Sequence, residues 1–172
     1  AGVWLLYFAF AASIASIAPL VYQVMLDLGM NRAEMGTVLA AWQLTYIFCS
    51  VPCGGLLDRF GPRRTMFAAV LVIALSVALR GLASDYVTLL LAVMVFGIGG
   101  PLISSGAPKV VAVWFTGKER GFAMGIYFTG NATGGIVTIA LTNSVFLPAI
   151  GGDWRDLMFY YALCIVGAGL IW

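Results

Sequence analysis

Six mostly apolar runs, separated by short polar turns, constrain this 172-residue chain more than any other feature. A membrane-spanning helix needs about 20 predominantly apolar residues. The runs predict spans over residues 2–26, 33–57, 65–83, 86–113, 121–147 and 157–172. Because 62% of the residues are hydrophobic and only 9% are charged, the chain has too few polar side chains to cover a surface in water. We therefore predict an all-α polytopic membrane protein.

The connections between the predicted spans indicate how the helices are arranged. Every connection is short, so neighbouring helices must run antiparallel and pack together. The spans divide near Ser84 into two sets of three, which suggests a 3+3 inverted repeat. We treat residues 1–172 as one six-helix bundle. Because the chain begins without Met and ends at Trp172 inside an apolar run, we expect it to be truncated at both ends.

Prolines and glycines mark places where the predicted helices lose regularity or approach one another. Pro19 should bend the first span. Gly97–Pro101 and Pro108 predict an irregular backbone in the fourth span, which lipid tolerates only where protein or a cavity covers it. In the fifth span, two pairs of glycines four residues apart predict close helix packing: Gly121 with Gly125, and Gly130 with Gly134.

Basic residues give the predicted bundle a sidedness, because arginine and lysine gather on the cytoplasmic side of a membrane. With a cytoplasmic N-terminus, the second-to-third and fourth-to-fifth connections are cytoplasmic. They hold Arg59, Arg63, Arg64, Lys118 and Arg120, with Lys109 nearby, whereas Arg32, Arg80 and Arg155 fall on the other side. We therefore expect a plasma or inner membrane protein with its N-terminus inside. Arg80 and Lys109, near the ends of their spans, are expected to snorkel to the interface.

The segment Gly54–Arg64 concentrates charge between the second and third spans. Asp58 closes its span at the negative end of the helix dipole, which disfavours an acid. It therefore needs an arginine or a helix N-terminus on another element, and Gly54, one turn earlier, would let that partner come close. Arg63 and Arg64 begin the next span at its positive end and also need outside partners. Such pairs can form in one conformation and break in another, which is the behaviour of a gate.

This segment resembles the signature loop of the major facilitator superfamily, in its glycines, its acid and its arginines. The matching residues are Gly54, Asp58, Arg59, Gly61, Pro62, Arg63 and Arg64. Two further connections are similar to those of the same family, namely Trp114-Phe115 with Glu119-Arg120-Gly121 and Met124-Gly125, and Trp154-Arg155.

The resemblance implies twelve spans in the intact protein, of which this chain holds the N-terminal six. It implies a secondary transporter that works by alternating access around a cavity between two halves. The first and fourth spans would line that cavity, with help from the second and fifth, and Asp58 would brace one rim against the missing half. A small-molecule substrate with a coupling proton or ion, the lipid bilayer and the missing C-terminal half are the expected partners.

Polar residues at mid-membrane depth are the candidate cavity residues. They are Ser13, Gln43, Ser105 and Asn131. Each also has a plainer interpretation, because serine bonds to its own helix backbone and amide side chains join neighbouring helices. Lys109 is the only cation even partly inside a span. Asp27 and Glu34, at the outer rim, are the candidate proton-carrying acids of this half.

Several other classes of function are disfavoured by the sequence. The chain has no histidine, no cluster of metal ligands or nucleophiles inside its spans, and no complete nucleotide-binding motif, so we expect neither an enzyme nor a cofactor or metal. A net charge of +2 is too small to indicate nucleic-acid binding. A non-transporting six-helix sensor or structural domain stays open as an alternative.

Departures from patterns within the family narrow the substrate. Proton-coupled drug exporters often carry an arginine where this chain has Val93, and a proline where it has Asn131. Both differences disfavour drug export, which is kept as an alternative. The Lys118–Gly125 connection resembles that of uptake carriers for small anions. The resemblance therefore implies a symporter of a small organic or inorganic anion.

Overall fold

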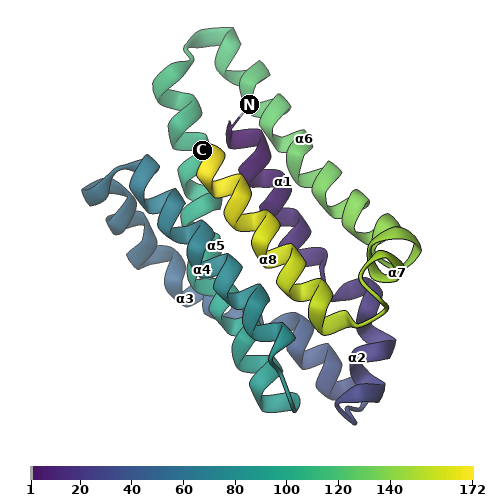
Figure 1. Ribbon diagram of the computed structural model, residues 1–172. Coiled ribbons are helices and arrows are strands. Elements are labelled where there is room, and N and C mark those ends of the chain that lie inside the picture. Colours follow the sequence, from purple (N-terminus) through teal and green to yellow (C-terminus); the bar gives the residue numbers. More distant parts are fainter. Residues whose placement is uncertain (1) are drawn as a thin grey trace.

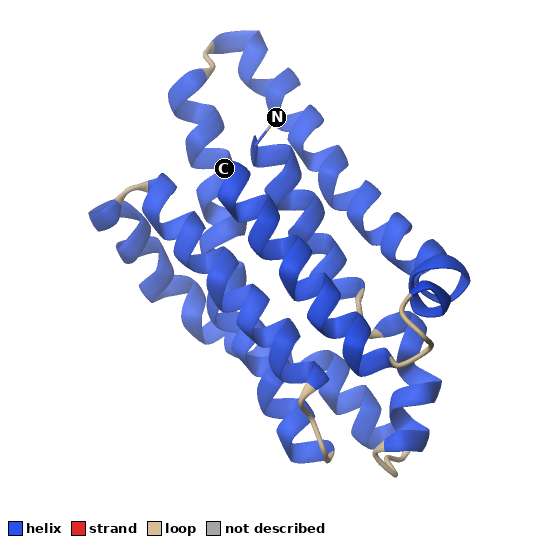
Figure 2. Ribbon diagram, in the orientation of Figure 1, coloured by secondary structure: helices blue, strands red, loops and turns tan. Residues whose placement is uncertain are grey.

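The computed structural model describes residues 2–172, and they form six helical spans joined by short turns (Figures 1 and 2). The helices are α1 (Gly2–Ala15), α2 (Val21–Asp27), α3 (Arg32–Phe60), α4 (Pro62–Gly81), α5 (Tyr86–Trp114), α6 (Gly117–Leu141), α7 (Leu147–Ala149) and α8 (Trp154–Ile171). A 3₁₀ turn, η1 (Ala18–Leu20), joins α1 to α2, and a π-helical segment, η2 (Thr142–Phe146), joins α6 to α7.

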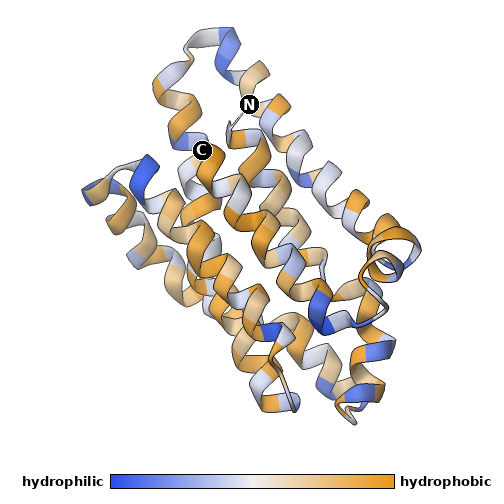
Figure 3. Cartoon of the chain, in the orientation of Figure 1, coloured by the Kyte–Doolittle hydropathy of each residue, from blue (hydrophilic) through white to orange (hydrophobic). Residues whose placement is uncertain are grey.

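Six of these helical stretches are long and apolar enough to cross a membrane. Hydrophobic residues run along the helices and hydrophilic residues gather at their ends (Figure 3). The predicted all-α protein with six membrane spans is therefore confirmed. The turn between α3 and α4 lies near both chain termini, at what we call the Gly61 end; the turn after α2 lies at the opposite, Asp27 end (Figure 1).

The contacts between helices follow the inverted arrangement of three spans and three spans. Exchanging the two sets pairs α1 with α5, α3 with α6 and α4 with α8. Under this exchange the extensive contact of α3 with α5 becomes that of α6 with α1. The exchange turns the contact between α4 and α5 into the contact between α8 and α1, and it leaves the contact between α4 and α8 unchanged. The structure contains each of these contacts.

Glycines set how closely the helices cross. A Cβ atom at Gly130 would lie 2.5 Å from the Trp4 carbonyl oxygen, and one at Gly134 would overlap the Phe8 carbonyl. The predicted close packing at this pair is confirmed, and it brings α6 against α1. At Gly121 and Gly125 a Cβ would meet nothing within 4 Å, so the prediction for that pair is wrong. Those two glycines lie in the first part of α6, where residues are mostly exposed.

Two helices begin with reciprocal side-chain caps, which fix the turns at the Asp27 end. Asn31 accepts a hydrogen bond from the Glu34 amide (2.9 Å), and Glu34 accepts one from the Asn31 amide (2.8 Å). Asp85 and Thr88 make the same exchange before α5 (2.8 and 3.1 Å). Each exchange satisfies backbone N–H groups that a helix start leaves free.

The irregular backbone lies elsewhere than the sequence predicts, except at Pro19. The first span is broken there, as expected, because α1 ends at Ala15 and a 3₁₀ turn follows. The fourth span was expected to be irregular at Gly97–Pro101 and Pro108, but α5 is continuous through both. Its glycines press against neighbours; a Cβ at Gly97 would lie 2.5 Å from the Trp42 carbonyl oxygen. This close packing with α3 holds α5 helical despite its prolines.

Candidate functional site

Two spans lie at the margin of the bundle and present their side chains outward. Only 17% of the most apolar stretch of α3 and 22% of that of the fifth span are buried, compared with 56% for α4 and for α5. Many large apolar side chains of α3 and α6 are exposed, among them Phe48 and Ile136. These faces meet lipid or another part of the protein, so polar residues beside them are candidates for a ligand site.

A polar cluster forms where α1, α3, α5 and α6 meet, and we call Tyr7, Tyr46, Ser104 and Tyr127 the tyrosine cluster. The Tyr7 hydroxyl donates to the Ser104 carbonyl oxygen (3.3 Å). The Tyr46 and Ser104 hydroxyls share a hydrogen bond. The ring of Tyr127 stands edge-on to that of Tyr7, with centroids 4.8 Å apart. Tyr46 and Ser104 are half-buried, so this part of the cluster is not sealed inside the bundle.

The cluster was missed as a site by sequence reasoning, although Tyr46 shares a polar stripe with Gln43 and Ser50. Tyrosines at helical spacing are indistinguishable in sequence from aromatic residues that only fill a core. What separates them is that helices far apart in the chain bring their hydroxyls to one point. The sequence signal that was missed is a hydroxylated residue within each of three separate spans, namely Tyr7 in α1, Tyr46 in α3 and Ser104 in α5.

The four predicted cavity residues fall in different environments. Gln43 and Ser105 are exposed, and Asn131 is half-buried beside Gly130. Ser13, in contrast, has no exposed surface, and its hydroxyl donates to the Phe10 carbonyl oxygen of its own helix (2.7 Å). The plainer interpretation holds for Ser13, which therefore does not line a cavity in this structure.

At the Gly61 end, Asp58 forms an ion pair with Lys109 of α5. The expectation of a partner on another helix is met, but the partner is a lysine and not an arginine or a helix N-terminus. The Lys109 ammonium group lies at the partly exposed rim, which agrees with the snorkelling prediction, and there it binds this carboxylate. The Lys109 side chain is 43% exposed and that of Asp58 is 70% exposed, so water reaches the pair.

The ion pair borders a shallow hollow of about 350 Å³. Its lining includes Gly54, Ser105 and Arg120 together with the two charged partners. A Cβ atom at Gly54 would meet nothing within 4 Å among residues 2–172, so Gly54 leaves this hollow open. Lys109 and Ser105 thus bring a cation and a hydroxyl to the same accessible space.

The rest of the signature segment shapes the turn between α3 and α4. Gly61 has a φ of 78°, which favours glycine, and it both ends α3 and begins α4. The Arg59 guanidinium lies 5.4 Å from the centroid of the Phe60 ring. Arg63 and Arg64 are exposed, and neither forms an ion pair within residues 2–172. These arginines are free to meet lipid headgroups or another part of the protein.

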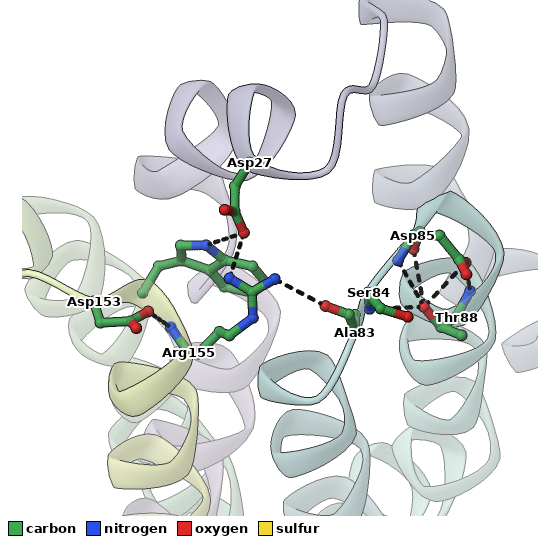
Figure 4. A network of polar contacts seen from close by, with 8 residues as sticks. Asp27, Ala83, Ser84, Asp85, Thr88, Asp153 and Arg155 are labelled. Carbon is green, nitrogen blue, oxygen red and sulfur yellow. Dashed lines mark hydrogen bonds and ion pairs between the residues drawn. The ribbon is translucent and has the colours of Figure 1, made fainter.

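At the Asp27 end, the acid is held by two neighbouring residues of α8 (Figure 4). Asp27 pairs with Arg155 and accepts a hydrogen bond from the Trp154 indole N–H (3.2 Å). Arg155 also donates to the Ala83 carbonyl oxygen (3.2 Å) and stacks over the Trp154 ring, 4.5 Å from its centroid. This cluster ties α2 and α8 to the turn before α5. Glu34 is likewise engaged, in the cap of α3.

Arg80 contradicts the snorkelling prediction. Its side chain is only 2% exposed, and it lies inside the bundle against α1 and the ring of Phe96. The prediction is wrong because α1 and α8 cover this last turn of α4, so that Arg80, although it is the penultimate residue of the helix, does not reach water or headgroups.

These features define an integral, multi-pass membrane protein built as a six-helix bundle, with an ion pair at one end and a polar cluster among four spans. The family model of the Major Facilitator Superfamily matches residues 3–172. The chain belongs to the major facilitator superfamily, a family of transporters. The resemblance found in the signature segment is thereby confirmed.

Two relatives of the chain are named for the transport of sugar acids. The chain is 30% identical over 131 residues to a probable L-galactonate transporter of Escherichia coli (strain K12), covering 76% of this chain and 28% of that protein. It is 28% identical over 146 residues to the hexuronate transporter of Bacillus subtilis (strain 168), covering 85% of this chain and 33% of that protein. The chain thus spans about a third of the length of these relatives.

The fold is that of solved transporters of the family. The crystal structure of a bacterial homolog to the human lysosomal transporter Spinster, in an inward-facing and unoccupied conformation, superposes with a TM-score of 0.84 at 19% identity. The superposition covers 99% of this chain and 40% of that protein.

Proposed function

We propose that this chain is the N-terminal half of a secondary transporter that moves a small, hydroxylated organic anion by alternating access. The tyrosine cluster is the observation that carries this proposal, because it places hydroxyl groups where four spans meet beside exposed helix faces. The family, and the sugar acids named for two relatives, support the same substrate class. Neither of these two relatives is named for an inorganic anion, the class that we also considered.

The substrate contacts follow from the chemistry of a sugar acid. Such a molecule carries several hydroxyls, which both donate and accept hydrogen bonds, and one carboxylate, which only accepts. Tyr46, Ser104 and the amides of Gln43 and Asn131 provide matching groups beside accessible space. Lys109 is the cation of this half closest to them along α5, five residues beyond Ser104. We propose that it attracts the carboxylate when its pair with Asp58 opens.

The ion pair of Asp58 and Lys109 serves as the gate in this proposal. An exposed pair contributes little to stability, so its formation and rupture can accompany a change of conformation at low cost. We propose that the Gly61 end faces the cytoplasm, because most basic residues lie there. Asp27 and Glu34 are held in local contacts, and neither lies at mid-depth. We therefore assign the coupling proton to a carboxylate of the other half. Arg63 and Arg64 would also contact that half, at the Gly61 end.

Uptake measurements on the full-length protein in proteoliposomes test the substrate site. Tyr46→Phe removes one hydroxyl from the cluster and keeps the ring, so we expect KM for a labelled sugar acid to rise about tenfold with little change in maximal rate. Asn131→Ala should also raise KM.

Tyr22→Phe is the matched control, because Tyr22 is 74% exposed at the Asp27 end. Its KM should equal that of the unaltered protein. An unchanged KM in Tyr46→Phe and Asn131→Ala, with intact transport, would remove the tyrosine cluster and Asn131 from the substrate site.

A further inference from the structure

The break in the first span leaves backbone groups that the membrane interior does not hydrate. α1 ends at Ala15, and Pro19 follows in the 3₁₀ turn. The last carbonyl groups of a helix have no partner within that helix. Unsatisfied carbonyl groups are costly where no water is present, so another part of the protein must supply donors.

Arg80 of α4 supplies them. Its Nη1 atom donates to the Ser13 carbonyl oxygen (2.8 Å) and to the Ser16 hydroxyl oxygen (3.0 Å). The Ser16 hydroxyl in turn donates to the same Ser13 carbonyl oxygen (2.9 Å). One guanidinium group therefore closes the final turn of α1.

The charge of Arg80 is balanced without an acid. Within residues 2–172 no carboxylate oxygen lies within 4 Å of its guanidinium nitrogens. The C-terminal end of α1 carries partial negative charge, and the face of the Phe96 ring lies 5.8 Å away. Arg80 also donates to the Ser76 hydroxyl (3.4 Å), which itself donates to the Ala92 carbonyl of α5 (2.7 Å). The cation thus joins three helices.

The far side of the break is fastened to a different helix. The Pro19 carbonyl oxygen accepts a hydrogen bond from the Asn143 amide (2.9 Å), which belongs to the π-helical segment η2. The break in the first span and the irregular segment of the fifth span therefore lie together. Arg80 fixes the α1 side of the break to α4, while Asn143 fixes the other side to the fifth span.

Substrate binding does not explain Arg80. Its two acceptors in the first span, at Ser13 and at Ser16 just after α1, belong to residues with no exposed surface. A ligand could reach the guanidinium only by displacing α1.

We propose that Arg80 is a positioning residue that caps the broken end of α1 and thereby fixes where the first span bends. In the proposed transporter, the segment from η1 to Asp27 then swings about a point held by Arg80. That consequence rests on the proposed function, whereas the cap itself does not.

Hydrogen exchange of the full-length protein in lipid nanodiscs tests the cap. Ser16→Ala removes one of the two acceptors in the first span, and Arg80→Lys keeps the charge but loses the planar fork of donors. We expect the backbone amides of residues 14–18 and 20 to exchange about tenfold faster in both variants; residue 19 is a proline and has no amide hydrogen. Ser144→Ala is the matched control, because that hydroxyl bonds to its own helix at Ala140 (2.9 Å). Its exchange over residues 14–20 should stay unchanged.

Sugar-acid uptake gives the second readout. Ser16→Ala and Arg80→Lys should lower the maximal rate several-fold and leave KM unchanged, because the substrate site is not touched. Unchanged exchange over residues 14–20 in both variants would overturn the cap. If exchange rises and the unaltered protein transports no sugar acid, the cap stands and the proposed function fails.

Discussion

Two cations near the ends of their spans, Arg80 and Lys109, occupy opposite environments. Arg80 is buried and held by carbonyl and hydroxyl oxygens of a broken helix. Lys109 is half exposed and held by one carboxylate at the rim of a hollow. The buried cation can contribute strongly to stability because its partners lose hydration, whereas the exposed pair can open cheaply. The first is suited to fix a bend and the second to act as a gate.

The largest expected effect on stability is that of Arg80→Met. It removes both donors from the end of α1 and leaves a buried carbonyl and hydroxyl with fewer partners. We expect the free energy of unfolding in detergent to fall by about 3 kcal/mol. The exposed Arg32→Met should change it by less than about 0.5 kcal/mol. Equal free energies of unfolding for the two variants would contradict the strong stabilising role of the buried Arg80.

A smaller effect is expected at the Asp27 end. Asp27→Asn keeps the shape of the side chain but removes the charge that Arg155 pairs with. The pair is partly exposed, so we expect a loss of about 1 kcal/mol in the same unfolding measurement. Asp156→Asn is the control. Asp156 follows Arg155 in the first turn of α8 and forms no ion pair within residues 2–172. A loss as large as that of Arg80→Met would show that burial does not decide the difference.

Lys109→Met should change stability by less than about 1 kcal/mol, because its ion pair is exposed. Uptake, however, should fall about tenfold or more if the pair acts as a gate. Exchanging the two charges, with Asp58→Lys and Lys109→Asp together, should restore part of the uptake lost in either single variant. A double variant no better than the singles would argue that the pair is not the gate.

The smallest effect concerns Asp85, the exposed cap of α5. Hydrogen bonds from Thr88 hold the pKa of the Asp85 carboxyl below its usual range. A carboxyl with a lowered pKa in the folded state contributes stability above its unfolded pKa and loses it as the pH falls through the folded value. Asp85→Asn keeps an acceptor that does not titrate. Its thermal midpoint should therefore lie below that of the unaltered protein at pH 7, and the difference should shrink as the pH falls below the usual range of a carboxyl pKa. A difference that does not change with pH would contradict the cap.

The sequence was sufficient for the number of spans, the break at Pro19 and the family, because each depends on local composition or spacing. It could not distinguish Arg80 from Lys109, since both lie about one turn from a span end and the surrounding helices decide their depth. The sequence could not predict the tyrosine cluster either, because four separate spans contribute its hydroxylated residues. The glycines of α5 misled for a related reason: close packing against α3, which only the structure shows, keeps that helix regular.

Accumulation of a labelled sugar acid by proteoliposomes containing the full-length protein tests the central claim most directly. The measurement compares that acid with an apolar organic cation typical of drug exporters, under an imposed proton gradient. We predict uptake of the acid that unlabelled sugar acid inhibits, and no movement of the cation. Export of the cation without uptake of the acid would identify a drug exporter instead. Movement of neither compound would favour a non-transporting membrane domain and contradict the account.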